Sequence, residues 1–555
     1  MKSMNIVILS GGTGNTAILQ GIKKWYPKAN INIIVNAYDD GKSTGICRDI
    51  VNTLGVSDVR KNHEKILRLT NPTSPYLELY SARYNLPKGK EEKFVLKKMK
   101  EIEDKHKVKF ADDFKTAVKV FFSEAMAEFY TFKDFNIMNI IYSAIWSELG
   151  YASGNYKICS IIGIEDNVIL NTYNNVHISA RTKKGKLLVD EGHIVDFCDN
   201  KDYIKKIHYD VKPSRQEVNP SAIKVIEEAD LIIVSTGTFW SSILPTIEYG
   251  NMYEYLNEAK AKKIWVVNST RDKDSWAEHP YTFLSTADSI GLDSTQWTAI
   301  YNLDSPIEPT ATEKAVGKGY HLGMIGDGKN DPYLVGRAIF DVYFGIPKGI
   351  QQVLVDFDGT ISSSDCLSEP FVMSILAKMD NVTLITGNTL DHIKKLYGED
   401  FIKTNKIWAN ANSEYFVNGH RKKILKSNRV KLSWGEAQGL INLDIMPLID
   451  DYCVKFRPLY VYRKEICDEI NEKLEANYSD RCLVARCTGK TTIDILNKAN
   501  NKGEIYYKNK YYKYKTLYIG DELEDGNDKT IASLCDYSIN VNNPYETGII
   551  FRLLQ

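Results

Sequence analysis

An apolar stretch in the middle of the chain ends abruptly in two carboxylates. The run VLVDFDGT at positions 353–360 places Asp356 and Asp358 two residues apart, directly before a glycine and a threonine. Alternate residues of a strand point to the same side. Both carboxylates can therefore face the crevice beyond the strand's carboxyl end, where open α/β sheets bind ligands. Two carboxylates this close repel each other unless a cation or a shared proton relieves them. The run therefore predicts an α/β unit that binds magnesium and a phosphate.

Three further features follow this run in a fixed order. Thr386 and a glycine end a second apolar strand, and Lys502 opens a helix. Asp521 ends a third strand, with Asp525 and Asp528 close behind. A carboxylate nucleophile, a hydroxyl, a lysine and distal acids are the groups that phosphoryl transfer through an aspartyl phosphate uses. The lysine would neutralise the phosphate, and the acids would supply the oxygen ligands that magnesium needs.

This ordered set resembles the haloacid dehalogenase superfamily of phosphatases and phosphomutases over residues 351–555. DFDGT, LITG, the lysine and GDELED are similar to the four motifs of that family in turn. The resemblance implies that Asp356 is the nucleophile and Asp358 the general acid and base, while Thr386 and Lys502 hold the phosphoryl oxygens. It also implies a magnesium site made by Asp356, the backbone carbonyl of Asp358, Asp521 and Asp525.

The intervals between these motifs predict where a cap domain is inserted. The interval between Asp358 and Thr386 is short, whereas that between Thr386 and Lys502 has room for a small α/β domain, expected at about 415–490. In this respect the unit is similar to the branch that contains sugar-phosphate phosphatases and phosphomannomutases, which implies a small phosphorylated substrate. Asn388 departs from the pattern, because many relatives place an arginine there.

A glycine-rich turn follows the first strand of the chain. Residues 5–10 and 31–37 are expected to form buried strands on either side of a helix from Thr16 to Tyr26, which is a βαβ opening. Glycines at such a turn let backbone N–H groups approach a phosphate at the helix N-terminus. Asp39 and Asp40 end the second strand, where a Rossmann fold carries its ribose-binding acid. The sequence therefore predicts a doubly wound, Rossmann-like domain that binds a nucleotide at Gly11, Gly12, Thr13, Gly14 and Asn15.

The first 345 residues also resemble a known family. GGTGN, YDDGKSTG (38–45), SDVRK (57–61) and ADLIIVSTGTFWSSILP (229–245) are similar to segments of the 2-phospho-L-lactate transferase (CofD-like) family and its gluconeogenesis-factor relatives. The resemblance implies a ligand linked to a nucleoside diphosphate, such as a nucleotide sugar. Asp39, Asp40, Ser43 and Thr44 would lie at its phosphates or metal. A second phosphate-binding turn would be formed by Gly237, Thr238 and Ser241.

Other parts of the chain carry weaker patterns. Two helical stretches lie between residues 62 and 130, short strands joined by turns are expected over 158–195, and a helix from Pro332 to Tyr343 closes the first unit. The stretch at 344–352 is a brief linker. The tract YYKNKYYKYK (506–515) is expected to be a solvated hairpin and not a nucleic-acid site.

Composition narrows the class of protein. The 555 residues include 71 Lys and Arg and 71 Asp and Glu, which gives no sign of nucleic acid or an anionic membrane as a partner. Nine cysteines lack any CxxC pair, which argues against structural zinc and for a reducing compartment. Because the chain has no apolar run of roughly 18 residues, we expect no membrane span. We expect a cytoplasmic protein.

These observations favour a magnesium-dependent phosphatase for a small phosphorylated metabolite, fused to a domain that binds a nucleotide or nucleotide sugar. A regulatory protein that senses nucleotide sugars, a phospholactate-type transferase and a phosphomutase are the alternatives. The substrate, the nucleotide and any homo-oligomeric state are left open.

Overall fold

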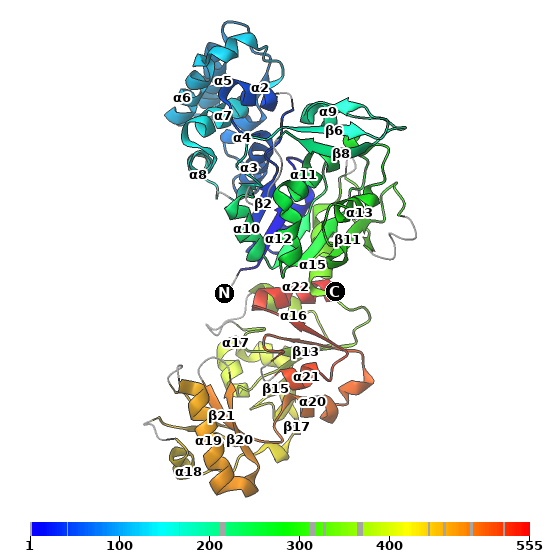
Figure 1. The fold of residues 1–555 in the computed structure, drawn as a ribbon. Coiled ribbons are helices and arrows are strands. Elements are labelled where there is room, and N and C mark those ends of the chain that lie inside the picture. Colours follow the sequence, from blue (N-terminus) through cyan, green and yellow to red (C-terminus); the bar gives the residue numbers. More distant parts are fainter. Residues whose placement is uncertain are drawn as a thin grey trace. The chain divides into compact units, whose positions relative to one another are not determined.

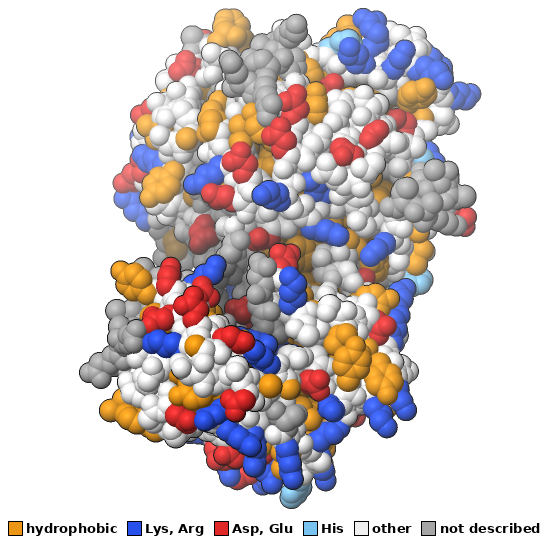
Figure 2. All heavy atoms as spheres, turned by 60° about the horizontal axis from the view of Figure 1, so that its bottom comes forward, with side chains coloured by type: hydrophobic (Ala, Val, Ile, Leu, Met, Phe, Trp, Pro, Cys, Tyr) orange, Lys and Arg blue, Asp and Glu red, His pale blue; other side chains and the backbone are white. Residues whose placement is uncertain are grey.

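Figure 1 shows the computed structural model of the chain. The structure describes residues 3–41, 43–165, 167–210, 218–309, 317–325, 329–362, 370–441, 445–458, 462–488, 492–524 and 528–555. The chain divides into two compact units, Ser3–Tyr343 and Phe344–Gln555. No helix in the described part of the chain is both long and apolar enough to cross a membrane. Both signs of charge occur side by side over the face in Figure 2, in keeping with the balanced composition.

The N-terminal unit is built on a seven-stranded sheet in the order β12-β11-β10-β9-β1-β2-β5. Every described pairing in it is parallel. Chain order runs outward from β1 in one direction through β2 and in the other through β9, so the direction reverses between β1 and β9. Such a switch point opens a ligand crevice at the carboxyl ends of the strands. The strands are β1 (Asn5–Leu9), β2 (Asn30–Val35), β5 (Val168–Leu170), β9 (Leu231–Val234), β10 (Lys262–Val266), β11 (Trp297–Asn302) and β12 (Gly317–Tyr320).

Helices cover this sheet and form a separate helical layer between β2 and β5. In α1 (Thr16–Trp25) the buried residues recur at helical spacing, so that one face packs onto the sheet. The inserted layer consists of α2 (Ser43–Val51), α3 (Ser57–Thr70), α4 (Tyr76–Ser81), α5 (Glu91–His106), α6 (Asp112–Ser123), α7 (Ile137–Leu149) and α8 (Tyr151–Ile162), with the short strands β3 (Arg83–Tyr84) and β4 (Phe135–Asn136). The later helices are α10 (Pro220–Glu227), α11 (Leu244–Glu248), α12 (Met252–Glu258), α13 (Phe283–Asp288) and α15 (Pro332–Phe344).

The segment from 158 to 195 differs from the strands predicted for it. Its first residues belong to α8, and its last residues form the short helix α9 (Glu191–Val195). The side chain of Asp190 starts α9 by accepting a hydrogen bond from the backbone N–H of His193 at 2.8 Å. Between the two helices lie β5 and part of a three-stranded sheet formed by β6 (Ile178–Thr182), β7 (Leu187–Leu188) and β8 (Ile204–Tyr209).

The C-terminal unit, coloured yellow to red in Figure 1, is built on a second seven-stranded sheet in the order β17-β16-β15-β14-β13-β22-β23. Its direction reverses between β13 and β22, whose carboxyl ends therefore flank the predicted crevice. The strands are β13 (Gln352–Asp356), β14 (Val382–Ile385), β15 (Lys406–Ala409), β16 (Glu414–Val417), β17 (His420–Ile424), β22 (Thr516–Gly520) and β23 (Tyr537–Asn540). Its helices are α16 (Pro370–Leu376), α17 (Leu390–Thr404), α20 (Lys502–Lys508), α21 (Lys529–Ala532) and α22 (Pro544–Leu554). Both sheets confirm the α/β prediction.

A small second layer is inserted between β17 and α20. It has a four-stranded sheet in the order β18-β19-β21-β20, with its own apolar core against α18 (Trp434–Gly439) and α19 (Arg463–Tyr478). We call residues 430–497 the cap. The predicted start near 415 was wrong, because β16 pairs antiparallel with β15, β17 pairs antiparallel with β16, and both strands extend the core sheet. The predicted end at 490 falls before β21. The cap strands are β18 (Leu448–Ile449), β19 (Val454–Phe456), β20 (Leu483–Thr488) and β21 (Thr492–Asn497).

The tract at 506–515 is not a hairpin. It continues α20 to Lys508 and then forms a short 3-10 helix, Tyr511–Lys513, before β22.

Candidate functional site

The side chain of Lys502 joins the end of β13 to the residue that precedes α21. Asp356 is the last residue of β13, and Lys502 is the first residue of α20. The position of that helix start is fixed by Asn501, whose side chain accepts a hydrogen bond from the backbone N–H of Glu504 at 3.1 Å. The Lys502 Nζ donates to Asp356 Oδ1 and to Asp528 Oδ1. Two residues that are far apart in sequence thus share one buried ammonium group.

A third carboxylate completes this cluster. Asp521 follows β22, and carboxylate oxygens of Asp356, Asp521 and Asp528 lie within 4.8 Å of one another. Burial raises the pKa of Asp356 well above its usual range, against the opposing charge of Lys502. Burial followed by repulsion from Asp528 raises the pKa of Asp521 to about 6. The cluster therefore holds more negative charge than the lysine alone can neutralise.

The donor set fits a hard divalent cation. Three carboxylates supply the oxygen ligands that magnesium prefers, usually completed by water and substrate oxygens. Asp528 is fully buried, and its Oδ2 has no hydrogen-bond partner among the described residues. An acceptor that is buried without a partner is costly unless something binds it. A divalent cation would offset the excess charge of the three carboxylates.

Asp358 is held apart from this cluster by neutral donors. The Thr386 Oγ1 donates to Asp358 Oδ2 at 3.2 Å, and the Asn388 amide donates to both Asp358 oxygens at 3.0 and 3.1 Å. Thr386 in turn accepts the backbone N–H of Asn388 at 3.0 Å. One carboxylate of the pair therefore has a lysine partner, and the other is exposed and has neutral partners among the described residues.

The backbone after Asp358 passes so close to Asp521 that position 359 requires a glycine. Gly359 has a φ of +83°, which favours glycine, and a Cβ at this position would collide with the carboxylate of Asp521. Thr360 Oγ1 also donates to Asp521 Oδ1 at 3.3 Å. The DGT part of the sequence thus positions the acid of the neighbouring strand.

The structure brings Asp356, Asp358, Thr386, Lys502 and Asp521 to one crevice. Asp525 lies outside the described residues. Asp528 was noted next to the last motif but not predicted as a site residue, although it contacts the lysine directly. The signal for it was its place three residues after Asp525 in the same acidic segment.

The predicted phosphate turn of the N-terminal unit lies at the other switch point. The turn at 11–15 follows β1 and packs against the turn that follows β9. Thr236 Oγ1 donates to the carbonyl of Gly14 at 2.7 Å, and a Cβ on Gly14 would collide with the Thr236 carbonyl. The side chain of Asn62 donates to the carbonyl of Gly11 at 3.2 Å. The two predicted phosphate turns are therefore adjacent.

Carboxylates from α3, from α9 and from the loop after β2 lie near one another beside this turn. Asp58 in α3 lies against Gly12, and its Oδ1 accepts from the Lys61 Nζ at 3.4 Å. Burial, and then the charges of Asp39 and Asp58, raise the pKa of Glu191 in α9 well above its usual range. Sequence reasoning missed Asp58 and Glu191. SDVRK pointed to the first, but the second lies in a helix that was read as strand.

Several predicted residues have their side chains bound to other groups. Asp39 accepts from Thr44 Oγ1 at 3.3 Å, and Ser43 Oγ accepts from Asn139 at 2.9 Å, so these residues lie together. Asp40 instead turns to His177 at 2.8 Å and to Arg48 at 3.7 Å.

Asn15 and Ser241 are likewise engaged within the protein. Asn15 is buried and donates to Asn62 at 2.8 Å. The Ser241 backbone N–H and hydroxyl both donate to Asp274 Oδ2, at 3.1 and 3.3 Å, and the hydroxyls of Thr238 and Ser242 are hydrogen-bonded at 3.0 Å. Gly237 lies against Gly14 and Ser242 lies against Gly11, so the second turn meets the glycine turn at these residues.

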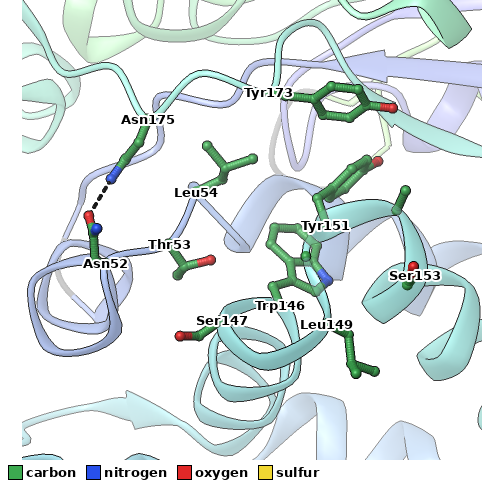
Figure 3. A pocket seen from close by; sticks show the side chains of 12 residues that line it. Asn52, Thr53, Leu54, Trp146, Ser147, Leu149, Tyr151, Ser153, Tyr173 and Asn175 are labelled. Atoms are coloured by element: carbon green, nitrogen blue, oxygen red, sulfur yellow. Dashed lines mark hydrogen bonds between the residues drawn. The ribbon is translucent and has the colours of Figure 1, made fainter.

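A separate cavity of about 440 Å³ lies in the helical layer. Figure 3 shows it between the loop after α2, the junction of α7 with α8, and the loop after β5. No predicted site residue lines it, and its lining has no charged side chain. The Ser147 hydroxyl, at this end, donates to the carbonyl of Val51 at 3.0 Å, whereas Asn139 contacts Ser43 at the opposite ends of the same helices. The cavity thus lies at the other end of α2 and α7 from Ser43 and Asn139.

Comparisons with known structures find proteins similar to each part of the chain. A UPF0052 family protein from Bacillus halodurans is 16% identical, with a TM-score of 0.47, covering 61% of this chain and 99% of that one. An N-terminally truncated IMP-nucleotidase from Plasmodium falciparum is 15% identical, with a TM-score of 0.30, covering 40% of this chain and 75% of that one.

Sequence comparisons concern the N-terminal part. A putative gluconeogenesis factor of Aquifex aeolicus is 26% identical over 314 residues, which are 55% of this chain and 80% of that protein. The gluconeogenesis factor of Listeria innocua is 24% identical over 265 residues, which are 47% of this chain and 66% of that protein. A family model described as 2-phospho-L-lactate transferase CofD matches residues 6–293. Because this match spans more than half of the 555 residues, the chain belongs to the 2-phospho-L-lactate transferase CofD family.

Proposed function

We propose that the C-terminal unit, residues 351–555, is a magnesium-dependent phosphomonoesterase of the haloacid dehalogenase type that acts on a small phosphorylated metabolite. The observation that carries this proposal is that the two carboxylates of the DxD motif have different partners. Asp356 contacts a buried lysine, while Asp358, two residues on, is held by the Thr386 hydroxyl and the Asn388 amide. Two carboxylates in such different surroundings suit two different chemical roles.

The first half of the reaction forms a phosphoenzyme. A carboxylate oxygen of Asp356 attacks the phosphorus, the new O–P bond forms, and the ester P–O bond breaks. Asp358 gives its proton to the departing alcohol oxygen. Lys502 neutralises charge on the nucleophile and the phosphoryl oxygens. Thr386 orients Asp358 and can donate to a phosphoryl oxygen.

The second half releases phosphate. Asp358, now a carboxylate, takes a proton from a water molecule as its oxygen attacks the phosphorus. The Asp356–phosphorus bond breaks, inorganic phosphate leaves, and both carboxyl groups return to their starting states. Asp356, Asp521 and Asp528 would hold magnesium, together with Asp525 as the resemblance implies. When bound, the ion supplies charge stabilisation for the phosphoryl group.

Hydrolysis of p-nitrophenyl phosphate by the full chain tests this proposal. We expect activity with magnesium, its loss in EDTA, and its loss in Asp356→Asn. Asp400→Asn, an exposed carboxylate on α17, is the matched control and should keep wild-type activity. Equal background rates in wild type and Asp356→Asn would reject the phosphatase. The Asp358→Asn variant should accumulate a phosphoryl adduct on Asp356 that mass spectrometry detects.

For the N-terminal unit, residues 1–345, we propose binding of a nucleotide or nucleotide sugar. The adjacent glycine turns after β1 and β9 support this proposal, because parallel strands place both at one switch point. In a thermal-shift screen of nucleoside diphosphates and nucleotide sugars, we expect a ligand-dependent shift that Gly12→Asp abolishes. A wild type that no ligand shifts would contradict the proposal.

The same measurements separate the alternatives. A sensor would bind nucleotide sugar without hydrolysing any phosphate ester. A phosphomutase would form the adduct on Asp356 but return the phosphoryl group to a sugar hydroxyl. A transferase would consume its nucleotide-linked ligand.

A further inference from the structure

One face of the cap sheet points toward the core of the C-terminal unit. Val454, Ala485, Ile493 and Ile495 pack into the apolar core of the cap with α19. Because alternate residues of a strand face opposite sides, their neighbours lie on the other face. That face bears Cys453, Lys455, Arg486, Asp494 and Leu496.

Contacts to the turn after β15 show which part of the core this second face meets. Cys453 and Leu496 form a small buried cluster with Ala411, which lies just after core strand β15. Ala411 N–H donates to the Gly387 carbonyl at 3.0 Å, so this cluster borders the loop that carries Thr386 and Asn388. The second face of the cap sheet therefore lies beside the proposed catalytic crevice.

Arg486 stands on this face without an acidic partner. It is half-buried, and its Nη1 donates to the carbonyl of Asn500 at 3.4 Å. It forms no ion pair with any residue that the structure describes. Asp494 is its cross-strand neighbour, but the charge of Asp494 acts on the Cys453 thiol, whose pKa is raised by burial and then by this carboxylate. Burial lowers the pKa of Arg486.

The contact with Asn500 places Arg486 close to the catalytic lysine in the chain. Asn500 precedes Lys502 by two residues, and its side chain donates to the carbonyl of Ala411 at 2.7 Å. The segment that returns from the cap to the core therefore passes next to Arg486 and contacts the turn after β15. A half-buried guanidinium without a carboxylate is costly, and a bound anion would relieve that cost through charge-assisted hydrogen bonds.

We infer that Arg486 binds a second anionic group of the substrate, so that the preferred substrates are phosphomonoesters that also carry a remote carboxylate or a second phosphate. Lys455 lies on the same face and adds positive charge there. The planar guanidinium suits carboxylate and phosphate alike, since both offer paired oxygens. This inference rests on the proposed phosphatase function of the same unit.

Three hexose substrates test it with the full chain and magnesium. Glucose 6-phosphate has no second anion, 6-phosphogluconate adds a carboxylate, and glucose 1,6-bisphosphate adds a phosphate. We expect kcat/KM to be on the order of ten-fold higher for one or both doubly anionic substrates, the value of a charge-assisted contact. The substrate with the higher kcat/KM shows whether the site prefers a carboxylate or a phosphate.

Three variants assign the effect to Arg486. Arg486→Gln should remove the preference and leave glucose 6-phosphate hydrolysis nearly unchanged, whereas Arg486→Lys should keep part of it. Arg481→Gln is the matched control, because Arg481 is paired with Glu436 at 2.9 Å elsewhere in the cap. Three outcomes would overturn the inference but not the proposed phosphatase activity. They are equal kcat/KM for all three substrates in wild type, a preference for doubly anionic substrates that survives Arg486→Gln, and an equal loss of kcat/KM for all three substrates in Arg486→Gln.

A binding measurement without turnover tests the anion subsite independently of the proposed phosphatase activity. Calorimetry of glucose 1,6-bisphosphate and 6-phosphogluconate with Asp356→Asn measures the subsite even if no substrate is hydrolysed. Affinity for at least one of them that falls about ten-fold on adding Arg486→Gln supports the anion subsite. Affinities that do not change on adding it, or no binding of either compound, overturn the subsite whatever the activity assay shows.

Discussion

Among the described residues, Lys502 is the cation that pairs with both Asp356 and Asp528, and its replacement by methionine removes both ion pairs. The side chains of Lys502, Asp356 and Asp528 are only 3%, 10% and 0% exposed. Removing one partner of a buried ion pair costs about 3–5 kcal/mol, because the remaining charge is left uncompensated. For a unit of this size, that loss lowers the melting temperature by roughly 10 °C. The control Lys508→Met breaks an exposed pair with Glu504 and should cost less than about 1 kcal/mol.

The pH dependence of this loss has a definite sign. Burial already raises the pKa of Asp356 above its usual value, and removal of the lysine raises it further. The folded state then binds more protons than the unfolded state, so stability falls as pH rises from the unfolded pKa through the folded one. We therefore expect Lys502→Met to be closer to wild type at pH 5 than at pH 8.

Hydrogen exchange of the full chain in EDTA measures this loss in each unit separately. In Lys502→Met, peptides from residues 344–555 should lose protection at pH 8, while peptides from residues 3–343 should keep theirs. Magnesium should restore part of the protection, because it supplies the missing positive charge. Wild-type protection at pH 8, or a loss that grows toward pH 5, would refute the electrostatic reasoning.

Three further predictions concern backbone geometry and a buried acid. Gly359→Ala should raise the magnesium concentration for half-maximal phosphatase activity roughly ten-fold, because the new Cβ displaces Asp521; an unchanged magnesium titration would contradict this. Gly14→Ala should destabilise the N-terminal unit by about 1–3 kcal/mol through its clash with the carbonyl of Thr236, measured by urea denaturation; an unaltered midpoint would count against the packing described. Burial raises the pKa of Asp274 to about 7, so its ionised form costs stability as pH rises from about 4 through 7. Asp274→Asn should therefore lose more stability at pH 5 than at pH 8 in thermal melts, and the opposite order would reject that assignment.

Local patterns in the sequence were sufficient to predict the functional groups at the ends of strands. DFDGT and GGTGN each join an apolar strand to a turn, so strand direction alone indicates that their side chains and amides face a crevice. The α/β class followed from the same pattern and is confirmed by the parallel N-terminal sheet and the mostly parallel C-terminal sheet. Lys502 was also predictable, because an asparagine before it marks a helix start.

Groups that depend on tertiary packing could not be predicted in this way. Glu191 joins the carboxylates near Asp39 only because Asp190 starts a helix in a stretch rich in strand formers. The hairpin at 414–424 has the same sequence pattern whether it extends the core sheet or opens a cap, and only its pairing with β15 decides. Arg486 gives no sequence signal, because its distinguishing property is that it forms no ion pair with any described residue, although Asp494 is its cross-strand neighbour.

The hydrogen bond between Asn500 and Ala411 has a consequence for protein engineering. It ties the segment that returns from the cap to the turn after β15, and Asn428, in the segment that enters the cap, donates to Ser413 of the same turn at 3.2 Å. The core thus holds both attachment points of the cap at one turn. A cap transplanted from another phosphatase between Asn428 and Asn500 would leave the crevice intact and change only the contacts made above it. Substrate range in this unit could thus be exchanged with the cap, provided that both ends of the graft keep the spacing that these bonds set.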